Sequence, residues 1–111
     1  MSFNDEIGFQ LGDDGVTIEL EPRSVHEVAP GTIHFAVLAT LGEVAAARAA
    51  GAAVVPTHLS VQLAKRARPG TRLEARGRVL RSGRSLVFAE GEVTQSGELV
   101  AKVAVTFARV G

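Results

Sequence analysis

Residues 31–50, GTIHFAVLATLGEVAAARAA, decide the fold of this 111-residue chain. They predict a helix that is apolar on nearly every side, and such a helix belongs at the centre of a fold, where other elements cover it. Helical spacing divides it into two faces. The first face holds the large side chains and suits packing against a sheet: Ile33, Val37, Leu41 and Val44.

The second face of this predicted helix consists of small residues around one acid: Ala36, Ala39, Thr40, Glu43, Ala46, Ala47 and Ala50. Small side chains allow another helix, a second subunit or a ligand to come close. A lone carboxylate is costly to bury, so Glu43 needs a partner, a proton or a function. The pattern alone leaves open that Glu43 reaches solvent at the edge of this face or pairs with an Arg.

The length predicts one domain over residues 1–111, with residues 1–14 as a partly flexible lead-in. Hydrophobic residues make up 46% of the chain, which is enough for an ordered core. The absence of cysteine excludes disulfides and thiolate metal sites. The formal net charge of +0 argues against a nucleic-acid partner. Three scattered histidines with no acidic cluster make a weak metal signal, and no metal is expected.

The N-terminal sequence MSFNDEIGFQ lacks the basic and apolar regions of a signal peptide. No uninterrupted apolar run reaches the roughly 18 residues of a membrane-spanning helix. His34, Thr40 and Glu43 break the longest run. We therefore expect a cytoplasmic protein with no membrane partner.

Alternating apolar and polar residues predict five strands around the helix. Their ranges are 16–20, 53–63, 71–81, 84–95 and 98–110. Ser82-Gly83 and Ser96-Gly97 predict two-residue turns in an antiparallel meander. The order of strand, helix and four strands predicts an α+β fold in which a long antiparallel sheet wraps around one central helix. A second subunit is the usual cover for the edges of such a sheet.

The strand expected at 53–63 has a predicted apolar face that includes Val55, Thr57, Leu59, Val61 and Leu63. Pro56, near its start, suits an edge position or a bulge. A basic turn, which contains Lys65, Arg66 and Arg68, follows this strand. At the other end of the helix, Thr32 is a candidate cap, and one helical turn is expected within residues 4–9.

Residues 31–110 resemble the PaaI-like acyl-CoA thioesterases, which have the hotdog fold. The resemblance rests on the order and spacing of short motifs: Gly31, His34, Phe35 and Ala36, then Leu41-Gly42-Glu43, ARPG at 67–70, SGELVA at 96–101 and Thr106-Phe107. Three positions depart from the family pattern. Phe35 and Ala36 replace two glycines, and Val28 stands where an Asn is common.

The resemblance implies hydrolysis of acyl-CoA thioesters to a free acid and CoA. It makes Glu43 the general base or nucleophile. It also makes the backbone N–H groups of Phe35 and Ala36 the oxyanion donors, helped by the helix dipole. The Ser or Thr that the family carries after the helix falls at Pro56 or Thr57, and Thr57 is the candidate hydroxyl.

Glu43 and the helix start are far apart along one helix. Eight residues separate Phe35 from Glu43, which is about 12 Å at about 1.5 Å per residue. One thioester carbonyl cannot touch both within a single helix. The mechanism therefore requires two subunits, as the hotdog resemblance implies, in a homodimer or a dimer of dimers (homotetramer).

The candidate substrate-binding residues are His34, Thr40, Lys65, Arg66, Arg68 and Arg84. CoA enters as part of the substrate, and no cofactor is expected. The three cations of the basic turn suit the phosphates of CoA. Arg84, with Arg81, flanks another turn and is a second candidate. His34 also suits a structural or capping role better than a catalytic one.

Two rival functions stay open. A hotdog domain that binds acyl-CoA without cleaving it fits the replaced glycines and the missing Asn. A hotdog enoyl-CoA hydratase or dehydratase also uses a His and a carboxylate, but the spacing of His34 and Glu43 fits the thioesterases better.

Overall fold

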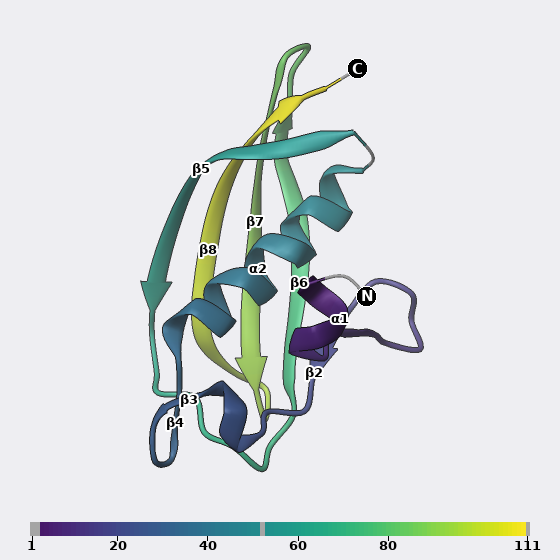
Figure 1. Ribbon diagram of the computed structural model, residues 1–111. Helices are drawn as coiled ribbons and strands as arrows, with labels where there is room; N and C mark the ends of the chain where they lie inside the picture. Colours follow the sequence, from purple (N-terminus) through teal and green to yellow (C-terminus); the bar gives the residue numbers. More distant parts are fainter. Residues whose placement is uncertain (1–2, 52, 111) are drawn as a thin grey trace.

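The computed structural model describes residues 3–51 and 53–110 (Figure 1). Its helices are α1 (Phe3–Ile7), the 3-10 helix η1 (Ser24–His26) and α2 (Phe35–Ala50). Its strands are β1 (Gln10–Leu11), β2 (Ile18–Leu20), β3 (Glu27–Ala29), β4 (Thr32–Ile33), β5 (Val54–Leu63), β6 (Leu73–Ser82), β7 (Leu86–Gln95) and β8 (Glu98–Arg109). Within the described ranges, no helix is long and apolar enough to span a membrane.

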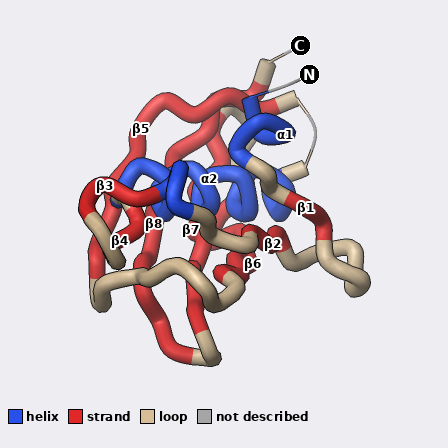
Figure 2. Tube along the Cα trace, turned by 60° about the horizontal axis from the view of Figure 1, so that its bottom comes forward, coloured by secondary structure: helices blue, strands red, loops and turns tan. Residues whose placement is uncertain are grey.

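Six of the strands form one antiparallel sheet in the order β1-β2-β6-β7-β8-β5, and β3 and β4 pair separately. The helix α2 lies across one face of the large sheet (Figure 1), and the strands bend around it (Figure 2). This arrangement confirms the predicted α+β hotdog fold with one central helix.

The expected meander covers only the last three strands. The turn Ser96-Gly97 has two residues as predicted, both with positive φ, at 53° and 77°, which suits a tight hairpin. The turn between β6 and β7 contains three residues, 83–85, rather than two. Strand β5 pairs with β8 and not with β6. The basic turn that connects β5 to β6 must therefore cross the ends of β8 and β7.

The helix begins four residues later than predicted, and Thr32 is not its cap. Thr32 and Ile33 form strand β4, and the Ile33 N–H donates to the Ala67 carbonyl at 2.9 Å. The cap is His34, whose Nδ1 accepts from the Ala36 N–H at 2.9 Å. This confirms the capping role considered for His34.

Backbone-to-backbone contact brings α2 unusually close to the sheet. A Cβ added at Gly91 on β7 would overlap the Gly42 carbonyl group, and one added at Gly77 on β6 would overlap the Ala45 carbonyl group. The small-residue face is therefore divided between two tasks. Ala46 packs on the sheet in a buried apolar cluster, while other members of the face border a cavity described below.

A bulge in β5 exchanges the two faces of the strand. Pro56 pairs with Phe107 and His58 pairs with Thr106, so Thr57 is the additional residue. As a consequence, Val54 and Val61 both pack against the core. The predicted alternation, which put Val55 on the face of Val61, is wrong at this point because it assumed an unbroken strand.

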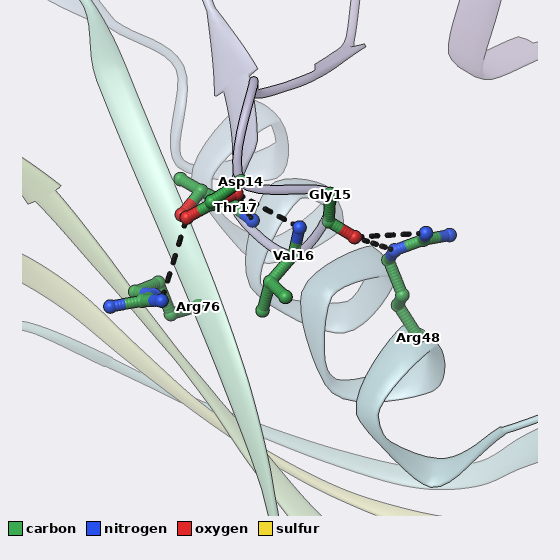
Figure 3. A network of polar contacts seen from close by, with 6 residues as sticks. All are labelled: Asp14, Gly15, Val16, Thr17, Arg48 and Arg76. Atoms are coloured by element: carbon green, nitrogen blue, oxygen red, sulfur yellow. Dashed lines mark hydrogen bonds and ion pairs between the residues drawn. The ribbon is translucent and has the colours of Figure 1, made fainter.

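Loop 12–17 lies against the side of α2 that carries Arg48 (Figure 3). The Asp14 carboxylate accepts from the Thr17 hydroxyl at 2.6 Å and from the N–H groups of Val16 and Thr17 at 2.9 and 2.8 Å. These hydrogen bonds lower the pKa of Asp14 to about 2. Arg48, on α2, donates to the Gly15 carbonyl at 3.0 Å. The expected lead-in thus contains a helical turn, a short strand that was not predicted, and a loop bonded to the core.

Candidate active site

Glu43 lies in a cavity of about 380 Å³ between α2 and β5. The residues that line it are Ala39, Thr40, Glu43, Pro56, Thr57, His58 and Leu59. The structure thus brings together three of the predicted site residues, Thr40, Glu43 and Thr57. It also adds His58, which the sequence did not single out because a lone His on a strand carries no signal.

The Glu43 carboxylate is half-buried and has no hydrogen-bond or ion-pair partner among the described residues. Burial raises its pKa above the ordinary range of a Glu carboxyl. Pairing with an Arg, which the sequence left open, is not observed. A carboxylate in this environment is suited to accept a proton from water or from a bound ligand.

The two hydroxyl groups of the cavity are already hydrogen-bonded to the main chain. The Thr40 hydroxyl donates to the Ala36 carbonyl at 2.8 Å, and the Thr57 hydroxyl donates to the Thr106 carbonyl at 3.2 Å. The bulge in β5 places Thr57 here. Each oxygen keeps lone pairs that can accept a hydrogen bond from a ligand or water.

The two predicted oxyanion donors at the start of α2 differ in whether their N–H groups are already hydrogen-bonded. The Ala36 N–H is engaged by His34, so a ligand can use it only when the His34 ring turns away. The Phe35 N–H has no acceptor among the described residues. The His34 ring stacks on the Phe35 ring, with centroids 4.8 Å apart.

A second, more apolar cavity of about 440 Å³ lies farther along the same side of α2. Its lining residues are Val28, Thr32, Ile33, Phe35, Leu38, Leu63, Ala64, Lys65, Arg66 and Ala67. It brings Phe35 together with two cations of the basic turn, Lys65 and Arg66. Leu63 is 58% exposed and Leu59, in the first cavity, is 42% exposed, so the edge strand β5 presents apolar side chains to solvent along both cavities.

The remaining predicted residues lie elsewhere. Arg68 belongs to the same basic turn as Lys65 and Arg66. Arg84 lies in the turn between β6 and β7, at the far end of the sheet from the basic turn, so the structure does not bring it to this group. His34 lines a small cavity of about 260 Å³ beside α1 and η1. No group of three or more potential metal ligands occurs within the described residues.

One polar residue near this site escaped the sequence analysis. Gln95 is buried at the end of β7, and its side chain bonds the main chain of the basic turn. The signal was present in the sequence, since Gln95 continues the core-facing alternation of Val93 with a polar side chain.

The fold and the cavities define a hotdog protein of thioesterase type. The profile of the thioesterase superfamily matches residues 30–102. The chain belongs to this superfamily.

Solved structures agree with this assignment. A mutant of the phenylacetic acid degradation protein PaaI from Thermus thermophilus is 26% identical, with a TM-score of 0.88 over 97% of this chain and 98% of that one. A conserved protein from Pseudomonas aeruginosa is also 26% identical, with a TM-score of 0.86 over 99% and 94% of the two chains. A thioesterase from Thermus thermophilus complexed with coenzyme A and Zn shares the fold, at 21% identity and a TM-score of 0.78 over 86% and 79%. A search of the curated proteins finds no match.

Proposed function

We propose that this protein hydrolyses acyl-CoA thioesters to a free acid and CoA, with Glu43 as the catalytic carboxylate. The observation that carries the proposal is the unpaired, half-buried Glu43 in a cavity between α2 and β5. Membership of the thioesterase superfamily supports the reaction class. The likeness to PaaI, at 26% identity over nearly the whole chain, supports the same class.

In the proposed mechanism, Glu43 takes a proton from a water molecule as the water attacks the thioester carbonyl carbon. The carbonyl oxygen becomes an oxyanion and accepts a hydrogen bond from the Phe35 N–H at a helix start. The tetrahedral intermediate then breaks its C–S bond, and the proton held by Glu43 passes to the leaving CoA sulfur. Direct attack by the Glu43 carboxylate on the same carbon is the alternative first step.

Two subunits are needed for this reaction, because Phe35 and Glu43 lie about 12 Å apart along α2. The edge strand β5 supports a subunit contact, since it borders both cavities and exposes Leu59 and Leu63. A second copy that pairs along β5 would remove an open sheet edge from solvent. The assembly is then a homodimer or a dimer of dimers.

The CoA portion of the substrate fits the second cavity. Lys65 and Arg66 stand at an apolar groove, which suits a thin organic arm that ends in phosphates. Arg68 is on the same turn. Neighbours with the same fold hold coenzyme A, and this shows that the fold accommodates such a ligand. The cytoplasmic location expected from the sequence stays a prediction.

The substitution Glu43→Gln tests the proposal. It keeps the shape of the side chain but removes its charge and basicity. We expect Glu43→Gln to assemble and bind acyl-CoA normally, to melt at or above the temperature of the parent, and to lose roughly 10²–10⁴-fold in kcat. Thiol release from acyl-CoA measures kcat, and Glu21→Gln, which makes the same change at an exposed position, is the control and should keep parental kcat. A variant that keeps more than about a tenth of parental kcat, well above that range, contradicts the role of Glu43.

A second candidate function is binding of acyl-CoA without hydrolysis. The observation that favours it is the engaged Ala36 N–H, since His34 occupies a donor that an oxyanion would use. Tight acyl-CoA binding by the parent protein with no thiol release would establish this function. Loss of the conjugated absorbance of an enoyl-CoA would instead show the hydratase reaction.

A further inference from the structure

The basic turn between β5 and β6 is held by one buried side chain. Gln95 is only 4% exposed, and all of its hydrogen-bonding atoms point into the turn. Its Nε2 donates to the carbonyl groups of Arg68 and Thr71, each at 2.7 Å, and its Oε1 accepts from the Arg68 N–H at 3.2 Å. Both amide hydrogens and the oxygen are therefore used.

The geometry fixes the identity of this residue. Two carbonyl oxygens face one amide nitrogen, so only a group with two N–H donors and an acceptor satisfies the site. A carboxylate of the same size would place a negative oxygen against two carbonyl oxygens. Unpaired buried main-chain groups are costly, so the turn cannot keep this path without the carboxamide.

The turn also leads to the start of α2. The Ala67 carbonyl, within the turn, accepts from the Ile33 N–H at 2.9 Å, and Ala67 itself is buried. Phe35, the proposed oxyanion donor, follows two residues after Ile33. Gln95 thus holds a turn that is joined to the helix start on one side and carries Lys65, Arg66 and Arg68 on the other.

We propose that Gln95 is a positioning residue for the coenzyme A portion of the substrate, acting through the basic turn. The inference rests on the proposed function, because it assumes that Lys65, Arg66 and Arg68 meet the CoA phosphates. Gln95 does not touch the ligand. It holds the main chain of the turn at Arg68 and Thr71, whereas the Lys65 N–H donates to the Val100 carbonyl at 3.3 Å. Its loss therefore weakens the contacts of the turn to phosphates, Arg68 first.

The test compares Gln95→Glu with Gln10→Glu, which makes the same charge change at an exposed position on β1. Calorimetry gives the affinity for CoA and for pantetheine, which has no phosphate. We expect Gln95→Glu to weaken CoA binding by about tenfold, the worth of one charge-assisted hydrogen bond. We expect an unchanged affinity for pantetheine, and we expect Gln10→Glu to bind both like the parent.

A combined variant shows that the effect passes through the three basic side chains. In a background of Lys65→Ala with Arg66→Ala and Arg68→Ala, the phosphate contacts are already gone, so Gln95→Glu should weaken CoA binding by less than about twofold. An equal loss of CoA and pantetheine binding, or full additivity in this background, overturns the inference. If Gln95→Glu does not fold, Gln95→Asn, which keeps the carboxamide but shortens its reach, is measured in the same way with the same expectation of a selective loss.

Thioester hydrolysis by the parent protein separates this inference from the proposed function. The parent protein could release no thiol and still bind CoA in a way that depends on Gln95. This result would refute the thioesterase activity but support the positioning role. Alternatively, the parent protein could hydrolyse the thioester while Gln95→Glu binds CoA as tightly as the parent. This result would support the thioesterase activity but refute the positioning role.

Discussion

The two sides of helix α2 differ in how their polar groups are satisfied. On the side of Arg48, loop 12–17 of the same chain supplies the partners, and Asp14, Arg76 and Arg48 are all hydrogen-bonded or paired (Figure 3). On the side of Glu43, the cavity faces an edge strand with exposed leucines, and the carboxylate has no partner among the described residues. The polar groups of the first side have a complete set of partners within one chain, whereas on the second side the proposed function assigns the carboxylate to a substrate and the edge strand to a second subunit.

The same substitution on the two sides should have opposite results. Ala39, which is 9% exposed, borders the Glu43 cavity, and the exposed Ala49 borders the groove beside Arg48. We expect Ala39→Arg to abolish assembly and to reduce kcat/KM by about 10²-fold or more, since even small misplacement of reacting groups has that effect. Ala49→Arg, on an exposed position, should keep both.

Light scattering and thiol release measure these two properties. A folded, active monomer of either the parent or Ala39→Arg would break the comparison, because it would show that one chain holds a complete site. Loss of assembly in Ala49→Arg would place the subunit contact on the side that we describe as complete.

The pH dependence sharpens the contrast on the Glu43 side. Burial raises the pKa of Glu43, and only the ionised form is a base. We expect kcat/KM to fall about tenfold per pH unit below that pKa, with the inflection above the ordinary range of a Glu carboxyl. An inflection within or below the ordinary range, measured from pH 4 to 8, would contradict a buried base.

The same raised pKa has a consequence for stability, with a defined sign. The folded state binds the Glu43 proton more tightly than the unfolded state, so this contribution to stability is present at acid pH and is lost as the pH rises through the folded pKa. Glu43→Gln should therefore gain in melting temperature over the parent as the pH is raised to 7.

The smallest effect is expected on the other side of α2. The pKa of Asp14 is lowered from 3.8 to about 2, so its stabilising contribution is present above the unfolded value and is lost as the pH falls through about 2. Asp14→Asn should lower the melting temperature slightly at pH 7, and the difference from the parent should shrink as the pH falls from 4 towards 2. Asp13→Asn, which removes the same charge at the neighbouring position, is the control for the change in net charge.

The periodic spacing of apolar residues within single helices and strands predicted most of the fold. The alternation of β6, β7 and β8, the tight turn Ser96-Gly97 and the apolar helix all follow from side-chain order along one element. The errors come from contacts between distant elements. Strand β5 pairs with β8 rather than its neighbour in sequence, and the helix starts late because Ile33 bonds to Ala67.

The candidate site was predictable only in part for the same reason. Glu43 stands out because an acid interrupts a face of small residues. The bulge that carries Thr57 was signalled only by Pro56, and no local rule gives the side to which it shifts the strand. The partners of Gln95 lie in a turn more than twenty residues away, so the alternation of the strand indicates a buried polar side chain at this position but not what it binds.

The backbone contact between Gly42 and Gly91 limits how the proposed thioesterase can be adapted to other substrates. Main-chain atoms of α2 and β7 touch there, directly beside Glu43, so side-chain changes cannot move the helix nearer to the sheet or alter the depth of the carboxylate. Under the proposed function, acyl groups of a new size must be accommodated by the exposed residues of β5 that line the cavity, such as His58 and Leu59. A library built to redirect the proposed thioesterase should vary these residues and leave both glycines untouched.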